Sequence, residues 1–343
     1  MHMKNSGGRQ KVTLKDIALA TGYSVNTVSR VLRDKDDIAP ETREKIRKAQ
    51  REMGYINNTL ASSLRRGYTN SIAVILGDIS NPHFGIMMSE IEVRARSYGY
   101  SSFLQNTSED EKLERAAIES ALNRSVDGII LCPCQSSEEN TLYLKSLGIP
   151  FVLIGRRFEQ IETDYVVCND EMGGYQATLE LLKKGHRRIL TIQGFEHISS
   201  TRERLAGYRR AHETMGVPVD ERLIWNGPVI GGNNEALYAQ LLEQVSDFTA
   251  VFAFSDLIAW DFWCFLRKRN LRVPEDVSLI GFDHIQSRLP SPFNLSSICS
   301  YKGKMSTQAV DVLMQKLKGE CEEPVQIVIE TSLHEGETVR SLA

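Results

Sequence analysis

From residue 70 onward, short runs of apolar residues alternate with longer stretches whose apolar positions recur at helical spacing. Short runs of branched and aliphatic residues are typical of strands buried in parallel sheets. The predicted strands are 72–76, 101–104, 128–131, 151–154, 165–167, 188–192, 250–254 and 277–281, and the predicted helices include 84–98, 110–123, 172–183, 202–215 and 257–270. Strand–helix alternation predicts parallel sheets covered by helices on both faces.

The series of strands divides near residue 168, which predicts two similar α/β lobes. Open α/β sheets bind ligands at the carboxyl ends of their strands. The cleft between the two lobes is therefore the natural place for a ligand.

Residues 12–53 follow a different pattern, that of three short helices. Thr13 and Asp16 have the spacing of a capping box at the start of the first helix. The sequence Gly22-Tyr23-Ser24 interrupts that helix, and Ser24 can cap a second helix that ends near Leu32. A third helix is expected at 40–53. Two short helices joined by a tight turn are typical of the helix-turn-helix.

The second of these helices has two unlike faces. Its apolar residues fall on one side, which suits packing against the first helix. The opposite side carries hydrogen-bonding side chains at helical spacing, namely Asn26, Ser29, Arg30 and Arg33. In a major groove, Arg pairs with guanine and Asn with adenine. We therefore favour a DNA-contacting helix over an ordinary amphipathic surface helix.

Charge separates the same two parts of the chain. Residues 1–68, the head, contain 14 Lys and Arg against 7 Asp and Glu, whereas the remaining 275 residues, the body, contain 27 against 37. A basic head on an acidic body favours a polyanion-binding module joined to a part with another task. Charge alone leaves a solvated basic surface as an alternative, so the DNA interpretation depends on the helix pattern.

Composition and the absence of certain motifs exclude several classes of protein. The 343-residue chain is 41% hydrophobic and 25% charged, as in a globular protein of two or three domains. No apolar run approaches the ~18 residues of a membrane span, and the start lacks a hydrophobic secretion segment, so a cytoplasmic location is expected. We expect no enzymatic activity and no catalytic residue, because the phosphate-loop, nucleophile-elbow and zinc-protease motifs are all missing.

Cysteine and histidine give no sign of a metal site. The six Cys and seven His are dispersed, and only Cys132 and Cys134 lie close in the sequence. Metal sites of the zinc type need paired spacings, so buried free thiols are the better interpretation. We expect no metal and no cofactor.

Two segments of the head, VTLKDIALATGYSVNTVSRVL and TREKIRKAQREMGYINNTLASSLRRG, resemble the lactose-repressor (LacI/GalR) family of bacterial transcription regulators. The resemblance covers about residues 12–335 and continues in Asp78-Ile-Ser-Asn-Pro-His-Phe84, Asp127-Gly-Ile-Ile-Leu, Gly185-His-Arg-Arg-Ile, Arg204-Leu-Ala-Gly-Tyr208, Phe254-Ser-Asp256 and Ile280-Gly-Phe-Asp283. It implies an α-helical helix-turn-helix DNA-binding head and a hinge helix, joined to a two-lobed α/β core like that of periplasmic binding proteins. The implied parts are a helix-turn-helix domain at 12–57, a hinge helix at 58–67, an amino-terminal lobe of 70–168 with about 297–325, and a carboxyl-terminal lobe of 169–296 with about 326–343.

By this resemblance the protein is a sequence-specific regulator, expected to be a repressor, that binds a pseudo-palindromic double-stranded DNA operator as a homodimer. Two hinge helices would pair in the minor groove, with Leu64 as the apolar wedge that kinks the central base step, in keeping with the physics of minor-groove binders. Asn58 can cap that helix, which is too short to be stable alone. The candidate DNA-binding residues are Thr13, Val25, Asn26, Thr27, Ser29, Arg30, Asn58, Ala61 and Leu64.

The resemblance also implies allosteric control by a small molecule, expected to be a carbohydrate, bound between the lobes. The candidate effector-binding residues are Phe84, Arg156, Arg204, Ser255, Asp256 and Asp283. Alternatives stay open: Arg204 could face water, Asp283 could serve a turn, and Phe84 could belong to the core. Arg156 stands where lactose-type proteins have an acidic residue. It could reach an anionic or polyhydroxyl ligand, or it could be solvated together with Arg157.

Two alternative functions are compatible with this sequence. A phosphorylated carrier protein could act as co-regulator by docking on the amino-terminal lobe. A sugar-binding protein that does not bind DNA is the second alternative, and the basic head opposes it.

Overall fold

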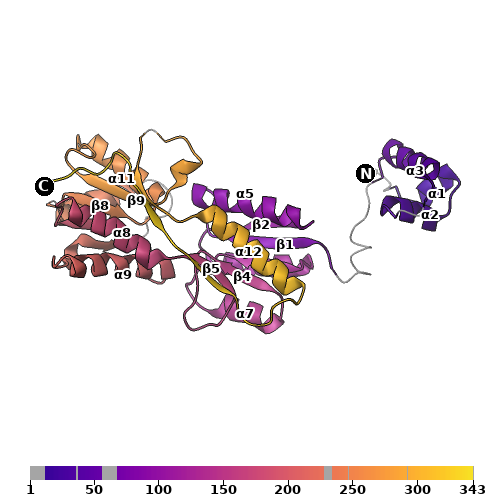
Figure 1. The fold of residues 1–343 in the computed structure, drawn as a ribbon, viewed down its shortest axis with the longest axis horizontal. Coiled ribbons are helices and arrows are strands. Elements are labelled where there is room, and N and C mark those ends of the chain that lie inside the picture. Colours follow the sequence, from indigo (N-terminus) through magenta and orange to yellow (C-terminus); the bar gives the residue numbers. More distant parts are fainter. Residues whose placement is uncertain are drawn as a thin grey trace, which may run out of the picture. The chain divides into compact units, whose positions relative to one another are not determined.

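The computed structural model describes residues 12–35, 38–55, 68–227, 234–245, 247–291 and 293–342. The chain divides into two compact units, Met1–Thr69 and Asn70–Ala343, which correspond to the head and the body (Figure 1). The hinge helix expected at 58–67 lies outside the described residues. In the described ranges, no helix is long and apolar enough to cross a membrane.

The described part of the head contains three helices: α1 (Leu14–Thr21), α2 (Val25–Leu32) and α3 (Pro40–Glu52). The predicted capping box is present, because the Thr13 backbone N–H donates to Asp16 at 2.7 Å and the Asp16 N–H donates to the Thr13 hydroxyl at 3.4 Å. Gly22 ends α1 with a φ of 77°, a left-handed conformation that favours glycine. The three helices bury a small core whose fully buried members are Ile17, Val28, Val31 and Ile46.

The described strands of the body form two six-stranded sheets. The first sheet, all parallel, has the spatial order β11 (Gln326–Ile329), β5 (Tyr165–Cys168), β4 (Phe151–Ile154), β3 (Gly128–Leu131), β1 (Ser71–Leu76) and β2 (Ser101–Asn106). The second has the order β12 (Ser332–His334), β10 (Ser296–Cys299), β9 (Ser278–Asp283), β8 (Ala250–Ala253), β6 (Ile189–Gln193) and β7 (Ile224–Asn226). Only β12 is antiparallel to its neighbour among these described strands. We call the lobes built on them the first and the second lobe.

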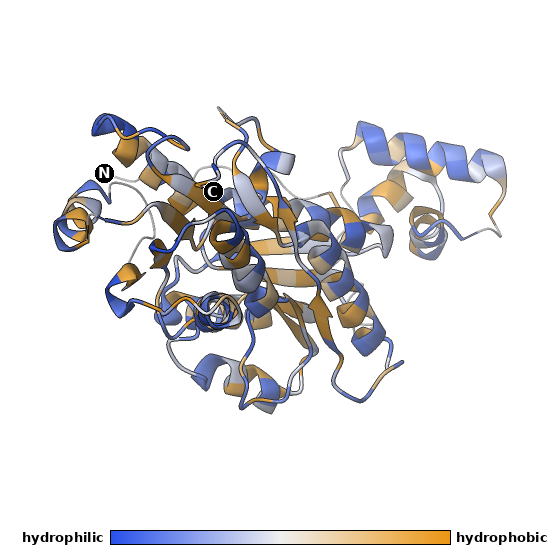
Figure 2. Cartoon of the chain, turned by 60° about the vertical axis from the view of Figure 1, so that its left-hand side comes forward, coloured by the Kyte–Doolittle hydropathy of each residue, from blue (hydrophilic) through white to orange (hydrophobic). Residues whose placement is uncertain are grey.

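Helices cover both faces of the first sheet. Ile72, Val74 and Leu76 of β1 belong to a cluster with α5 (Pro82–Ser97) and α12 (Lys302–Leu317). Ala73 and Ile75, which alternate with them, belong to a cluster with α6 (Glu111–Asn123) and α7 (Glu139–Leu147). Because successive residues of a strand point to opposite faces, a continuous apolar run is what a strand covered on both sides requires. Figure 2 shows the strands as hydrophobic and the helices with hydrophilic outer faces.

The second lobe is built in the same way. On one face lie α8 (Asp170–Lys183) and α9 (Ser199–Thr214), and on the other lie α10 (Glu235–Gln244) and α11 (Asp256–Lys268), with short 3₁₀ turns at Glu221–Leu223 and Ile285–Ser287. Two glycines let α8 and α9 approach closely. A Cβ on Gly174 would meet the Arg204 carbonyl oxygen at 2.2 Å, and a Cβ on Gly207 would meet the Glu171 carbonyl oxygen at 2.0 Å. This contact fixes the part of α9 that carries Arg204.

Along the described strands, the chain passes between the lobes three times, after β5, after β10 and after β11. We expected the second and third passages at about residues 296 and 325. Both come a few residues later, because Ser296–Cys299 pairs with β9 in the second sheet and Gln326–Ile329 pairs with β5 in the first sheet. The expected assignment of residues 326–329 to the carboxyl-terminal lobe and of 297–299 to the amino-terminal lobe is therefore corrected by strand pairing.

Candidate DNA-contacting helix and ligand pocket

The second helix of the head turns its apolar side inward and its polar side outward. Val28 and Val31 are fully buried. Asn26 and Arg30 are exposed, Ser29 is half-buried and Val25 is 41% exposed. The candidate DNA-binding side chains of α2 thus lie on the surface of a rigid three-helix unit, as base contact in a major groove requires.

Two candidate DNA-binding residues also hold the local fold. The Thr13 hydroxyl donates to Asp16 at 2.7 Å at the start of α1. The Thr27 hydroxyl lies 2.9 Å from that of Ser24, which caps α2 by accepting the Thr27 N–H at 3.1 Å. Asn58, Ala61 and Leu64 lie outside the described residues.

Ion pairs tie the third helix of the head to the end of the second. Asp34, just after α2, accepts hydrogen bonds from Arg43 at 3.3 Å and from Arg47 at 2.6 Å. Arg43 also donates to the Lys35 carbonyl at 2.7 Å. These two arginines of α3 therefore position α2 in addition to making the head basic.

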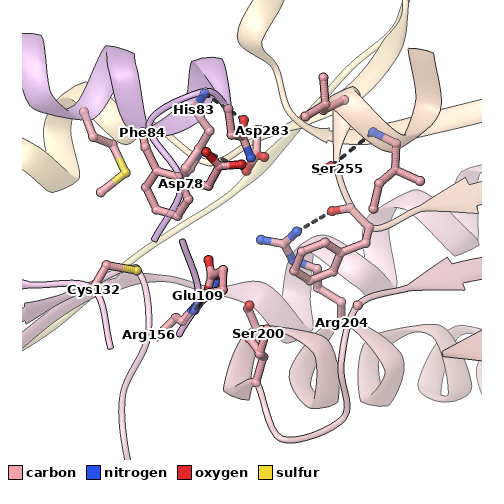
Figure 3. Close-up of a pocket in the computed structure, with 18 residues that line it drawn as sticks. Asp78, His83, Phe84, Glu109, Cys132, Arg156, Ser200, Arg204, Ser255 and Asp283 are labelled. Atoms are coloured by element: carbon pink, nitrogen blue, oxygen red, sulfur yellow. Dashed lines mark hydrogen bonds and ion pairs between the residues drawn. The ribbon is translucent and has the colours of Figure 1, made fainter. Parts of the chain in front are cut away.

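The body contains a pocket between the two lobes, where the carboxyl ends of the strands meet (Figure 3). This is the place that the general rule for open α/β sheets predicts. Residues that follow or end strands line it: Asp78 after β1, Glu109 after β2, Cys132 after β3, Arg156 after β4, Gly194 after β6, Phe254 and Ser255 after β8, and Asp283 at the end of β9. Helices α5 and α9 add Phe84, Met87, Ser200 and Arg204.

Arg204 lies in this pocket and is only 6% exposed, which excludes the alternative that it faces water. Its Nε donates to Asp170 at 2.7 Å, and Nη1 donates to the Phe254 carbonyl. Its guanidinium lies 3.5 Å from the centre of the Phe282 ring and 4.3 Å from that of Phe254. Burial opposes its charge, but the carboxylates of Asp170 and Asp283 raise the pKa of Arg204 above its usual value. The guanidinium is a fixed, charged donor at the pocket wall.

Asp283 faces the pocket from the second lobe and meets His83 of the first lobe. His83 Nδ1 and Asp283 Oδ1 lie 3.2 Å apart, near the top of the view in Figure 3. Both atoms are buried, and neither makes a well-aligned hydrogen bond within the described residues. Burial by itself raises the pKa of a carboxyl group, but His83, Arg204 and Lys302 together lower the pKa of Asp283. Asp283 is thus a charged acceptor with hydrogen-bonding capacity left for a ligand.

Arg156 is also in the pocket and is only 8% exposed, so the alternative of a solvated arginine is wrong. Its two terminal nitrogens bind the two oxygens of Glu109 at 2.7 and 2.9 Å, and Nη1 also donates to the Pro133 carbonyl at 3.0 Å. Burial works against the charge of Arg156, but Glu109 raises its pKa further above the usual value. The charge of this arginine is therefore compensated inside the protein.

Phe84 and Ser255 line the pocket and also serve the fold. Phe84 belongs to the core cluster of the first lobe and meets the His83 ring edge-on, with ring centres 5.3 Å apart. The Ser255 hydroxyl accepts the Ile258 N–H at 3.3 Å and so caps α11. Both remain candidate ligand contacts.

Asp256 does not line the pocket, although Ser255 beside it does. Its carboxylate accepts hydrogen bonds from the Ser297 hydroxyl at 2.6 Å and from the Ile285 N–H at 2.7 Å. It thereby holds β10 and the turn after β9. The assignment of Asp256 to the effector site is corrected: its side chain points into the second lobe, because consecutive residues at a helix start point in different directions.

Four further residues that were not among the predicted effector-binding residues line the same pocket, namely Asp78, His83, Glu109 and Ser200. Asp78 and Glu109 lie two and three residues after the ends of β1 and β2, close to the strand-end position that led to Asp283, so the same signal could have identified both. His83 and Ser200 lie in the first turns of α5 and α9. His83 falls within the segment Asp78–Phe84 that resembles the family, but only the fold shows that its side chain reaches the pocket.

No group of three or more His, Cys, Asp or Glu is arranged to hold a metal ion in the described parts of the chain. Cys132 and Cys134 are buried free thiols, and burial raises the pKa of Cys132 to about 12. A protonated thiol is a poor metal ligand. Cys264, by contrast, is exposed, so the prediction of buried free thiols does not hold for this cysteine.

A helix-turn-helix head joined to a two-lobed body with a ligand pocket in its cleft defines a ligand-controlled, DNA-binding transcription regulator. Comparison with known families agrees for both parts. A sequence model of bacterial regulatory proteins of the lacI family matches residues 13–58, and one of periplasmic binding proteins and the sugar-binding domain of the LacI family matches residues 69–336. The chain belongs to the LacI family, whose members are regulatory proteins rather than enzymes.

Individual relatives cover most of the chain. The HTH-type transcriptional regulator DegA of Bacillus subtilis is 36% identical over 279 residues, which are 80% of this chain and 82% of DegA. The HTH-type transcriptional regulator CelR of Thermobifida fusca is 31% identical over 332 residues, 95% of this chain and 97% of CelR. The solved structure of a transcriptional regulator CelR–cellobiose complex aligns with a TM-score of 0.72 at 29% identity and covers 96% of this chain and all of that chain.

Proposed function

We propose that the protein is a homodimeric repressor that acts in the cytoplasm, binds a pseudo-palindromic operator, and is controlled by an uncharged sugar in the cleft pocket. The observation that carries the sugar proposal is Asp283, whose buried Oδ1 lies in the pocket without a well-aligned hydrogen bond from the described residues. A ligand hydroxyl that donates to this oxygen would satisfy it. Arg204, opposite in charge, can donate to a second hydroxyl oxygen.

The pocket also suits the apolar faces of a sugar ring. Phe84, Met87, Phe254 and Ile258 line it beside the charged groups. Binding sites for small molecules combine such apolar walls with a few placed polar groups. The CelR–cellobiose complex, a related regulator with a sugar, supports the same ligand class for this chain.

Two copies of the head are needed because an eight-residue recognition helix reaches only a few base pairs. Symmetric half-sites on DNA then match the two-fold symmetry of a dimer. A sugar that binds one arrangement of the lobes better than another would change the spacing of the two heads. Such a ligand changes operator affinity only by its difference in affinity for the two arrangements.

The first experiment is the selection of genomic fragments by the purified full-length protein at ~0.15 M salt, where non-specific phosphate contacts are weak. We expect enrichment of a short palindrome next to genes for sugar uptake or breakdown. No enrichment, both alone and with cell extract added, would contradict sequence-specific binding. Enrichment only with extract would indicate that a co-regulator has to bind first.

The second experiment identifies the effector. Neutral mono- and disaccharides suggested by the neighbouring genes are titrated into the protein–operator complex, and the release of labelled operator is followed. We expect one sugar to change the operator dissociation constant at least about fivefold, the lower end of ordinary allosteric coupling. A sugar that binds the protein and leaves the operator affinity unchanged would contradict its role as effector.

A further inference from the structure

Glu109 and Arg156 form an ion pair inside the pocket that is built from two separate loops of the first lobe. Both residues line the cavity, and their side chains are only 12% and 9% exposed. The two-point contact at 2.7 and 2.9 Å holds the guanidinium against both oxygens of the carboxylate. With the bond to Pro133, it occupies three of the five N–H groups of Arg156.

The backbone around Glu109 is shaped to deliver this carboxylate. Ser108 and Glu109 have φ values of 51° and 57°, a left-handed conformation that is unfavourable for residues other than glycine. The Glu109 N–H donates to the Gly77 carbonyl at 3.3 Å, and the Thr107 hydroxyl donates to the same oxygen at 3.3 Å. Glycine at position 77 leaves room for this carboxylate, since a Cβ there would lie 2.1 Å from Glu109 Oε1 and would force the side chain of Glu109 to move. Space and backbone conformation are thus both adapted to the carboxylate of Glu109.

As a result, both arginines that line the described pocket are already paired with a carboxylate of the protein itself. Arg156 pairs with Glu109, and Arg204 pairs with Asp170. The lining residues carry three carboxylates, those of Asp78, Glu109 and Asp283, against the two guanidinium groups. A ligand anion at Arg156 would have to share the guanidinium with Glu109 or displace it, and either way two negative charges would lie buried side by side, which is strongly unfavourable.

We propose that Glu109 determines effector specificity: by holding Arg156 in an internal pair, it excludes sugar phosphates and sugar acids and leaves the pocket selective for uncharged polyhydroxyl ligands. This inference rests on the proposed function in that the pocket between the lobes is the effector site. The remaining N–H groups of Arg156 can still donate to the oxygen of a ligand hydroxyl. The same arginine without Glu109 would be an anion site.

The test uses inorganic phosphate as the probe and requires no knowledge of the natural effector. Glu109→Gln keeps the size of the side chain and removes its charge, so Arg156 becomes an uncompensated cation in the pocket. We expect phosphate to bind this full-length variant at least about tenfold more tightly than the wild type, as measured by calorimetry. Phosphate should also raise the thermal midpoint of the variant more than it raises that of the wild type.

The matched control is the double variant Glu109→Gln with Arg156→Gln, which has the same neutral total charge as the native pair. Phosphate bound by the basic head would be the same in all three proteins, so only the difference between them reports on the pocket. We expect the double variant to bind phosphate no better than the wild type. Glu109→Asp, which retains the charge, should also fail to gain phosphate binding.

Two results would overturn the proposal. One is equal phosphate binding by the wild type and by Glu109→Gln. The other, which holds even if Glu109→Gln alone does not fold, is phosphate that raises the thermal midpoint of the wild type more than that of the double variant, since the native pocket would then bind phosphate through Arg156. Neither result depends on the sugar titration, so failure of the sugar proposal and failure of the specificity proposal are distinguishable.

Discussion

Two aspartates at the carboxyl edge of the second sheet, 283 and 256, have opposite roles despite their closeness. Asp283 faces the pocket, whereas Asp256 is 1% exposed and holds Ser297 and Ile285. Asp283 itself has a φ of 99° and His284 a φ of 50°, so the turn after β9 is strained. The two hydrogen bonds to Asp256 stabilise this turn. Asp256 therefore acts on the pocket by positioning Asp283.

This placement gives Asp256 a measurable effect on stability. Burial first, and then the charge of Asp283, raise the pKa of Asp256 from 3.8 to about 7. The unfolded chain releases this proton near pH 4, whereas the folded protein keeps it until about pH 7. The contribution of Asp256 to the free energy of unfolding therefore falls as the pH rises between these values, by about 4 kcal/mol in total.

Asp256→Asn removes this titration. Its amide oxygen can accept the Ile285 N–H, and its amide nitrogen can donate to the Ser297 oxygen. We expect the free energy of unfolding of the variant, relative to the wild type, to increase between about pH 5 and about pH 7.5, as measured by urea denaturation. A variant that differs from the wild type by the same amount at both pH values would contradict the raised pKa.

Ser297→Ala is the complementary change. The Ser297 hydroxyl favours the charged form of Asp256 and thereby lowers its pKa. Without it, we expect the wild-type loss of stability toward neutral pH to become larger. A smaller loss in this variant would show that the hydroxyl does not stabilise the carboxylate.

The sequence could identify single residues of the pocket but not their partners. Arg204 and Asp283 were found because a motif and a strand end mark their positions. The contacts that decide their chemistry come from distant segments, such as His83 at Asp283 and Glu109 at Arg156. The sequence alone could not distinguish the roles of Ser255 and Asp256, because both lie at the start of the same helix. Only the position of the neighbouring strand shows which of the two side chains points into the lobe.

At the scale of elements, buried strands were the most predictable features. β3 and β4 have the expected bounds, because each is a short apolar run between polar turns. The helices α7, α10 and α12 were not among those singled out, and the passages between the lobes came a few residues late. β10 and β11 contain polar residues such as Ser296, Ser297 and Gln326, so only pairing with β9 and β5 defines them.

The start of α9 depends on the other lobe. Ile198 at its N-cap provides no side-chain hydrogen bond. Instead, Gln135 of the first lobe accepts the Ser199 N–H at 2.9 Å and the Ser199 hydroxyl at 3.1 Å. Its amide nitrogen donates to the Arg157 carbonyl at 2.7 Å. One buried glutamine therefore caps the helix that carries Arg204 and links it to the loop that carries Arg156.

Two substitutions of Gln135 separate its capping of α9 from its hydrogen bond to the Arg157 carbonyl. Gln135→Met removes both, and we expect it to lower the free energy of unfolding by about 1–2 kcal/mol and to speed amide exchange in the first turn of α9. Gln135→Glu keeps the acceptor for Ser199 and loses the donor to Arg157. It should retain slow exchange in α9 and speed exchange only in the loop around Arg157. Exchange in α9 that is unchanged by Gln135→Met would refute the cap.

At the scale of the whole molecule, several contacts join the lobes around the pocket. His83 meets Asp283, Gln135 meets Ser199, Arg157 binds Glu203 at 3.1 Å, and Arg288 binds Glu90. Each pairs a residue of the first lobe with one of the second. A ligand that contacts Asp283 and Arg204 on one side and Arg156 on the other would change the balance among these contacts, which is how occupancy of the pocket can alter the body as a whole.

Arg204 provides the sharpest test of that coupling, provided its partner is changed with it. Arg204→Ala alone would leave the buried carboxylate of Asp170 without a counter-charge. The double variant Arg204→Met with Asp170→Asn preserves the charge balance. We expect it to bind the operator as tightly as the wild type, because the head is unchanged, and to lose the effect of the sugar on that binding.

Arg202→Ala is the matched control. Arg202 lies on the same helix but is exposed, and it donates to the carbonyls of Glu196 and His197 instead of lining the pocket. Its removal should leave both operator affinity and the sugar response intact. Because coupling is reciprocal, operator DNA should also change the sugar affinity of the wild type and of Arg202→Ala by the factor with which the sugar changes operator affinity. If the double variant at Arg204 and Asp170 still responds at the same sugar concentration, Arg204 does not belong to the effector site.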